Sequence, residues 1–95
     1  MAAFTEGDLV RVSVLFLVDD SPLDPNVVTL RYKNPAGTIT VWVYLTDAQV
    51  VRDSVGLFRA DINANAGGVW SFRWEGTGPA QGAGQDTFTV TATNI

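Results

Sequence analysis

Cysteine and histidine are both absent from this chain of 95 residues. Without cysteine, neither a disulfide framework nor a thiolate metal site can support the fold, so apolar packing has to suffice. Without histidine, the chain lacks the usual general base, the commonest transition-metal ligand and the side chain that titrates near neutral pH. These absences exclude most familiar hydrolytic sites, and we expect a protein that is not an enzyme and holds no cofactor.

Long apolar stretches and runs of basic residues are also missing. No segment reaches the roughly 18 to 20 apolar residues of a membrane span, and residues 1–7 lack the basic start and apolar stretch of a signal peptide. The six Lys and Arg residues are scattered, and the formal net charge is −4, so a phosphate backbone would be repelled on average. We therefore expect no membrane and no nucleic-acid partner, and a protein made in the cytoplasm.

The residues that are present favour one folded domain. Hydrophobic residues make up 46% of the chain and charged residues 17%, which is too apolar for a disordered protein. The length is that of a single ordinary domain, and the sequence shows no internal repeat and no linker. We predict one domain over residues 1–95, in which residues 1–7 form an N-terminal arm that orders on contact with a partner.

Alternation of apolar and polar side chains predicts short β-strands throughout. The clearest run, between Leu9 and Val18, places Val10, Val12, Val14, Phe16 and Val18 on one face. About seven such runs, and no stretch of helical period, predict an all-β fold with two antiparallel sheets packed as a sandwich. In the later runs the inward side chains are predicted to be Val28, Leu30, Tyr32, Phe58, Ala60, Ile62, Trp70, Phe72, Trp74, Phe88, Val90 and Ala92.

Clusters of Gly, Pro, Asn and Asp mark the turns between these runs. Turns are predicted at 19–26, 34–37, 54–56 and 67–68, and the glycine-rich segment 76–85 is predicted to be a flexible hairpin loop. That loop lacks the following helix and the Lys-Ser or Lys-Thr pair of a phosphate-binding P-loop.

The run Ile39–Leu45 is apolar on both faces. Its aliphatic face is sufficient to serve the core, which leaves Trp42 and Tyr44 on the other face. These two residues either form an exposed interface or are covered by a loop. Together with Phe4 in the N-terminal segment, they are the residues that we assign to partner binding. The aliphatic face consists of Ile39, Val41, Val43 and Leu45.

Two groups of acidic residues are candidates for chemistry. Calcium is bound by carboxylates gathered in loops, and Asp19, Asp20 and Asp24 form such a cluster, with Asp86 as a further candidate member. Their spacing matches no EF-hand loop, and aspartates beside Ser and Pro also form turns. A pair of carboxylates such as Asp61 with Glu75 could act on sugars. Asp61 lies on the outward face of its predicted strand, however, where a solvated side chain is the expected state.

Trp70 and Trp74 offer a third candidate site. Aromatic faces stack on sugars and on nucleic-acid bases, so the two residues could form a binding platform. They also alternate with polar residues beside Phe72, as the buried aromatic residues of a sandwich core do. Burial in the core is the interpretation that we adopt.

Four segments carry a resemblance to known proteins that spans nearly the whole chain. The family that they resemble is a group of short immunoglobulin-like structural proteins encoded among the head and tail genes of tailed bacteriophages and prophages. The matching residues are Phe4, Thr5, Gly7, Asp8, Val10 and Arg11; Asp24, Pro25, Val28, Leu30, Tyr32, Asn34, Pro35, Ala36 and Gly37; Arg52, Asp53, Ser54, Gly56, Phe58, Arg59 and Ala60; and Gly68, Trp70, Phe72, Trp74, Gly76, Phe88 and Val90.

The resemblance implies an immunoglobulin-like β-sandwich and a role in a virion. Its matching residues are turn and core residues, so it specifies the fold better than the role. A chain that begins at Met1 and has little outside the sandwich fits a capsid decoration protein best, bound to the major capsid protein on the outer surface of the head. The alternatives are a head–tail connector or tail component, where the chain would self-associate, and a host-surface or carbohydrate-binding module.

Overall fold

The structure, a computed structural model, describes residues 3–92, and the regular structure among them is all β-strand. Five strands form one sheet, in the order β1-β10-β9-β5-β6, and three form a second, in the order β2-β8-β7; a short ribbon pairs β3 with β4. In chain order the strands are β1 (Ala3–Thr5), β2 (Leu9–Leu15), β3 (Leu17–Val18), β4 (Ser21–Pro22), β5 (Val27–Lys33), β6 (Ile39–Val43), β7 (Val51–Ser54), β8 (Leu57–Asn63), β9 (Gly68–Thr77) and β10 (Gly82–Thr91).

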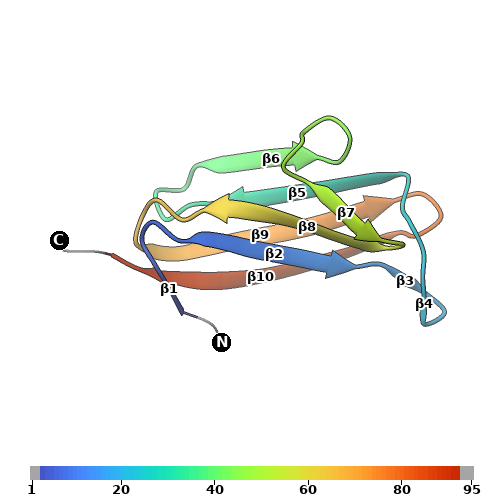
Figure 1. The fold of residues 1–95 in the computed structure, drawn as a ribbon, viewed down its shortest axis with the longest axis horizontal. Coiled ribbons are helices and arrows are strands. Elements are labelled where there is room, and N and C mark those ends of the chain that lie inside the picture. Colours follow the sequence, from blue (N-terminus) through green and yellow to red (C-terminus); the bar gives the residue numbers. More distant parts are fainter. Residues whose placement is uncertain (1–2, 93–95) are drawn as a thin grey trace.

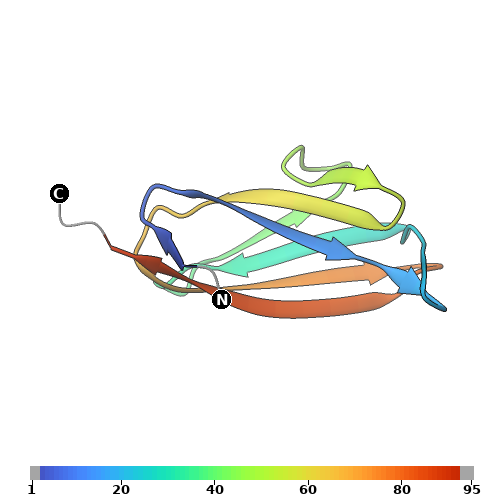
Figure 2. The ribbon, with the colours of Figure 1, turned by 60° about the horizontal axis from the view of Figure 1, so that its bottom comes forward.

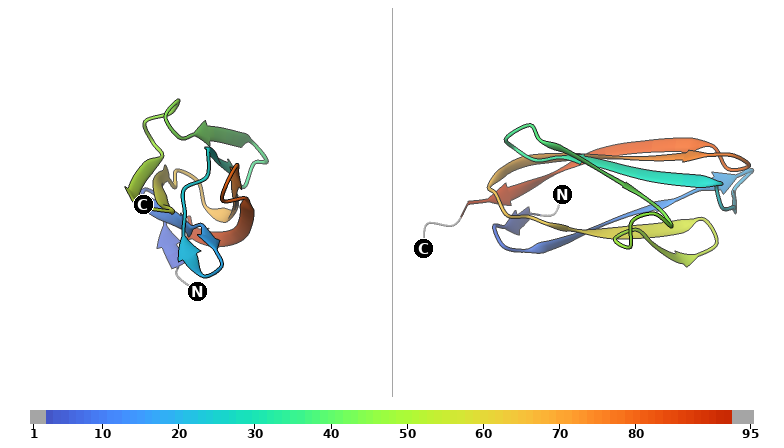
Figure 3. Two further views of the ribbon diagram at one scale, coloured as in Figure 1. Left: turned by 90° about the vertical axis from the view of Figure 1, so that its right-hand side faces the viewer. Right: turned by 90° about the horizontal axis from the view of Figure 1, so that it is seen from above.

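The two sheets lie face to face as two layers (Figure 1; Figure 3). Within each sheet the pairs are antiparallel, apart from β1, which runs parallel to β10. The predicted all-β antiparallel sandwich is therefore confirmed. Six of the seven longer strands correspond to runs predicted from alternation, and the seventh, β7, is a short segment without clear alternation. The short strands β1, β3 and β4 were not predicted as separate elements.

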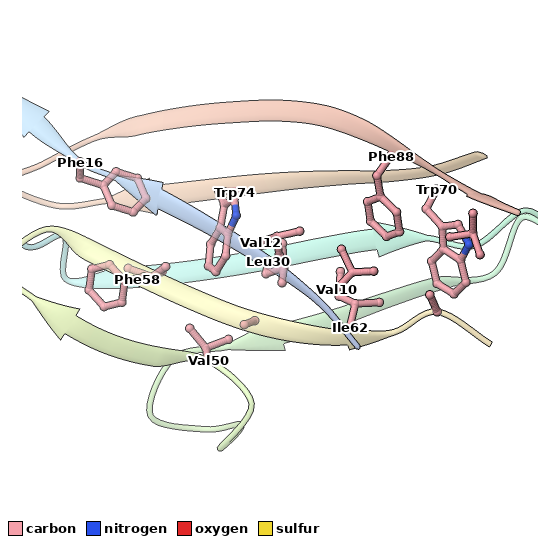
Figure 4. Packing of buried hydrophobic residues seen from close by; sticks show 14 of the residues in the cluster. Val10, Val12, Phe16, Leu30, Val50, Phe58, Ile62, Trp70, Trp74 and Phe88 are labelled. Atoms are coloured by element: carbon pink, nitrogen blue, oxygen red, sulfur yellow. The ribbon is translucent and has the colours of Figure 1, made fainter. Parts of the chain in front are cut away.

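The core lies between the layers and is built from the faces that alternation predicted for β2, β5, β8 and β9 (Figure 4). Leu30, Ile62 and Ala60 are completely buried. For these strands and β10, the pattern fails only at two strand ends, where Val18 and Ala92 are exposed. Val18 leaves the core because β3 turns away from β2 to pair with β4. The other buried apolar residues are Val10, Val12, Phe16, Val28, Val50, Phe58, Ala64, Trp70, Trp74, Ala80, Phe88 and Val90.

The face of β6 that packs on the core is the opposite of the predicted one. Ile39 and Val41 point to solvent, with 62% and 46% of their surface exposed, whereas Trp42 packs against the core. The reason is register: Trp42 lies opposite Leu30 of β5, and residues directly opposite in a sheet share a face. Since both faces of this run are apolar, alternation alone did not distinguish them.

The glycine-rich segment is mostly strand, which corrects the prediction of a loop over 76–85. Strand β9 continues to Thr77 and β10 starts at Gly82, so only residues 78–81 connect them. Gly76 is buried and faces the Phe16 ring, where a Cβ atom would lie 2.6 Å from a ring carbon. Glycine is needed here because another segment packs against the strand, rather than because the chain must flex.

The N-terminal segment is also ordered within the fold. Ala3–Thr5 pair with the end of β10, as Figure 2 shows, where β1 (dark blue) lies beside the last part of β10 (red). The Phe4 ring meets Phe88 edge to face, with ring centroids 5.7 Å apart. For residues 3–5 the predicted partner-dependent arm is therefore wrong; residues 1 and 2 lie outside the described part of the chain.

Two buried tryptophans of β9 differ in how their indole N–H groups are satisfied. Trp70 donates to the Ala66 carbonyl oxygen at 3.0 Å. Trp74, of which only 1% is exposed, has no acceptor for its N–H among the described residues. A buried donor without an acceptor costs about 1–3 kcal/mol.

This difference predicts unequal losses when each tryptophan is shortened to phenylalanine. Both variants leave unfilled volume in the core, but Trp74→Phe also removes the unsatisfied donor, whereas Trp70→Phe breaks a hydrogen bond. We expect Trp70→Phe to lower the free energy of unfolding by about 1–2 kcal/mol more than Trp74→Phe. Urea unfolding of the two variants measures this difference, and an equal or larger loss for Trp74→Phe would contradict it.

The close contact at Gly76 generates a second stability prediction. Gly76→Ala places a Cβ atom 2.6 Å from Phe16 and 2.8 Å from Pro25, so we expect the free energy of unfolding to fall by about 1–3 kcal/mol. Gly84→Ala in β10 is the matched control, because nothing lies within 4 Å of its added Cβ atom. The control should change stability by less than about 0.5 kcal/mol. Similar thermal midpoints for the two variants would show that the Phe16 contact is misplaced.

Candidate binding surface

The three residues assigned to partner binding do not form one patch. Phe4 lies on β1 and Trp42 on β6, which are the two opposite edges of the five-stranded sheet. All three are partly buried and packed on the core, and Phe4 contacts Phe88. The ring centroid of Trp42 lies 5.0 Å from that of Tyr32, and the ring centroid of Tyr44 lies 5.0 Å from that of Phe58. The outward orientation expected for Trp42 and Tyr44 is therefore wrong. Partner binding by these three residues stays a prediction, but the outward orientation on which it was based is not what the structure has.

The aromatic platform proposed for Trp70 and Trp74 does not exist in the folded protein. Only 2% of Trp70 and 1% of Trp74 is exposed, and both side chains point between the sheets (Figure 4). Neither ring has a free face on which a sugar or base could stack. The interpretation of these two residues as core is confirmed.

The carboxylates singled out in the sequence are engaged in structural contacts. Asp61 accepts hydrogen bonds from Arg11, and Glu75 pairs with Arg31 on the other sheet, so the two carboxylates do not come together. Among residues 3–92, no three acidic side chains gather as a metal ion would require. In the suggested calcium cluster, Asp24 instead accepts hydrogen bonds from the Arg52 side chain and from the Gly56 N–H.

Several aspartates cap backbone N–H groups at the sides of the five-stranded sheet. Asp47 Oδ2 accepts the Val43 N–H at 2.8 Å on the edge strand β6. At the other edge Asp8 accepts the Thr5 N–H at 2.9 Å. On β10, which β1 covers only at its last residues, Asp86 accepts the Thr87 N–H at 2.8 Å. Charged side chains that occupy outward N–H groups oppose the addition of a further strand. These three contacts therefore oppose strand addition at these positions of the sheet.

The outer face of the five-stranded sheet concentrates basic side chains. Arg31 on β5 lies directly opposite Arg73 on β9, and Lys33 lies two residues further along β5. These are three of the six basic residues in the chain, and they accompany one carboxylate, Glu75, which gives a local net charge of +2 in a chain whose total is −4. We call this surface the basic face and include in it the exposed neighbours Ile39 and Val41 of β6.

Glu75 lies between the two arginines of the basic face and forms an ion pair with each. Its carboxylate lies 3.0 Å from Arg31 Nε and 3.6 Å from Arg73 Nε. Arg73 Nη1 also donates to Gln85 at 3.4 Å. Both guanidinium groups remain about half exposed. Around them is a shallow groove of about 270 Å³, whose lining includes Arg31, Lys33, Ile39, Ser71, Arg73 and Gln85.

The outer face of the three-stranded sheet provides a contrast. Arg11 pairs with Asp61 at 2.9 Å, and Arg59 pairs with Asp53 at 2.8 Å, so each basic residue has its own carboxylate. The hydrogen bond from Arg11 lowers the pKa of Asp61, which keeps this pair ionised. The charges on this face therefore balance, and the excess of positive charge is a property of the five-stranded sheet.

Sequence reasoning missed the basic face because its residues are distant in the chain. Alternation correctly placed Arg31, Lys33 and Arg73 on outward faces, but the scattered positions suggested no basic cluster. The cluster arises from the pairing of β5 with β9, which sets Arg31 beside Arg73. A prediction of strand order and register would have been needed to find it.

Asp24 joins the loop before β5 to the β7–β8 turn and generates a prediction of pH dependence. Its carboxylate accepts hydrogen bonds from Arg52 at 3.1 Å and from the Gly56 N–H at 2.7 Å. These bonds lower the pKa of Asp24, that from Arg52 most strongly. A lowered pKa in the folded state contributes stability above the unfolded value of about 3.9, and this contribution is lost as the pH falls through the folded value.

We therefore expect the stability advantage of the native protein over Asp24→Asn to be largest above about pH 5 and to shrink as the pH falls below about 4. Unfolding in urea at a series of pH values measures it. Arg52→Gln, which removes the main cause of the shift, should reproduce the effect. A difference between Asp24→Asn and the native protein that stays constant with pH would contradict the assignment.

Comparison with known proteins identifies no family for this chain. None of the described residues belongs to a helix of the length and hydropathy that crossing a bilayer requires. No protein-family model matches the sequence, and no curated protein matches it at a significant level.

Proposed function

We propose that this chain is a non-enzymatic structural protein that binds another protein through the outer face of its five-stranded sheet. The observation that carries the proposal is the basic face: three basic side chains with exposed Ile39 and Val41 on one face of a sheet, in a chain that is acidic as a whole. Exposed apolar and arginine side chains on one rigid surface are characteristic of protein interfaces. The aspartates at the sheet edges support binding by the face.

We propose further that the domain is immunoglobulin-like. In that fold one sheet contains the second, fifth and fourth strands side by side, and the other contains the last, sixth and third. Strands β2-β8-β7 and β10-β9-β5 have this order when the short strands β3 and β4 are set aside and β6 is taken as the additional strand of variable-type domains. The same pattern is what the resemblance to phage head and tail proteins implies.

Within this class we propose a capsid decoration protein that binds the major capsid protein on the outer surface of a phage head. A capsid offers many equivalent sites, so a small rigid domain with one complementary face is sufficient. The sandwich supplies the rigid scaffold, and the lattice multiplies weak single contacts. The resemblance over residues 4–90 supports this role.

The proposal is tested by co-sedimentation of the purified protein with phage capsids assembled without it, before and after expansion of the shell. We expect saturable binding at high stoichiometry and a higher temperature of shell disruption, because each bound copy stabilises the state to which it binds. Absence of binding to either form, or binding confined to one vertex, would contradict a decoration role and direct attention to the connector or tail.

A further inference from the structure

The basic face has an arrangement of charge that the fold alone does not require. Arg31 and Arg73 are directly opposite each other on neighbouring strands, a position in which like charges repel. Glu75 bridges them, but Lys33 has no ion-pair partner among residues 3–92. On the opposite sheet the chain pairs each arginine with its own carboxylate. The basic face thus retains positive charge that its own side chains do not neutralise.

The two arginines retain donors for a further carboxylate. Glu75 approaches each guanidinium group at Nε, which leaves terminal N–H groups directed away from that contact. A guanidinium has five N–H donors in a planar fork, and this fork matches the two oxygens of a carboxylate. Glu75 lies within ion-pair distance of both groups and offsets part of their mutual repulsion, while the net charge of the face stays positive and attracts a further acidic group.

The residues beside this charge favour a protein ligand over a nucleic acid. Exposed Ile39 borders the groove, Val41 follows it on the same face of β6, and Val69 lies exposed on β9. Tyr32 and Phe72 also line the groove, but both pack against the core. The exposed aliphatic side chains can exclude water from ion pairs, whereas base stacking would require a free aromatic face. The net charge of −4 also repels a polyphosphate at longer range.

A second copy of the chain is a poor match for the same site. Most of its carboxylates already pair with arginine or accept a backbone N–H, as Asp61 and Asp47 do. The exposed acidic pair that remains, Asp19 and Asp20, lies in the tight turn of the β3–β4 ribbon. That turn presents two carboxylates on a narrow tip rather than on a surface matching the sheet.

We propose that the basic face binds an acidic surface of a partner protein, in which Asp or Glu carboxylates meet Arg31, Arg73 and Lys33 and apolar side chains cover Ile39 and Val41. This inference rests on the proposed function, which it deepens by naming the chemistry of the partner. On a capsid, the partner surface would be an acidic patch repeated across the shell.

The test uses a synthetic peptide of alternating Glu and Val residues as the probe and ¹⁵N-labelled protein as the reporter. We expect amide shifts confined to β5, β6 and β9, with binding that weakens as salt is added. A peptide with Gln in place of Glu should produce no such shifts. Shifts on the three-stranded sheet, or equal binding of the Gln peptide, would overturn the proposal.

Two double variants with the same change of charge separate a specific surface from a general charge effect. Arg31→Gln with Lys33→Gln should weaken binding of the Glu peptide by about five- to tenfold. Arg11→Gln with Arg59→Gln, on the opposite sheet, is the matched control and should change it by less than about twofold. Equal weakening by both would overturn the proposal, as would tighter binding of single-stranded DNA or concentration-dependent self-association through the basic face.

The same variants distinguish the two proposals on capsids. If capsids bind the native protein and the Arg31→Gln, Lys33→Gln variant equally well, the acidic-partner inference fails while the decoration role stands. If the Glu peptide binds the basic face and capsids do not bind, the decoration role fails while the inference stands.

Discussion

The stacking of Trp70 on Phe88 is the contact on which the rest of the sandwich depends. The two rings lie opposite each other on β9 and β10, with centroids 5.8 Å apart and planes inclined by 12°. Phe4 meets the stack from β1 and Tyr32 from β5, so four of the five strands of one sheet contribute a ring. In a chain without cysteine, apolar packing of this inner face has to supply what disulfides supply in other small domains.

Because the aromatic residues pack in the core, other types of side chain make up the outer faces of the sheets. The outer face of the five-stranded sheet carries β-branched aliphatic and charged residues instead of rings, among them Ile39, Val41 and Arg31. Most of the carboxylates that have no arginine partner among residues 3–92 accept backbone N–H groups, as Asp47 does for Val43. The acidic residues therefore serve mainly the edges and turns, and the net charge of the chain gives no sign of the basic face.

Much of the fold follows from local alternation, because a strand with one apolar and one polar face has a single favourable orientation. This argument correctly placed Val10 and Val12 on β2 and Phe58 on β8. It failed for Ile39–Val43, where both faces are apolar and the pairing of Trp42 with Leu30 decides the orientation. It failed again at Gly76, where the glycine reflects close packing against Phe16.

The basic face was harder to predict than the fold, since it depends on register between distant strands. The outward positions of Arg31 and Arg73 could be read from the sequence, but their proximity required knowledge that β5 pairs with β9. Conversely, Trp42 and Tyr44 attracted attention because large aromatic residues suggest interfaces, and in the structure both help to close the core. Residue type drew attention to side chains that pack on the core, whereas strand topology reveals the basic face.

The central claim is that the aromatic side chains are buried between the sheets, and quenching of tryptophan fluorescence by acrylamide tests it directly. Trp70 and Trp74 are almost completely buried, and Trp42 is only partly so. We predict blue-shifted emission in which one accessible tryptophan accounts for nearly all of the quenching, with full quenching only after unfolding. Emission near that of free tryptophan, with all three residues quenched equally in the native protein, would contradict the central claim.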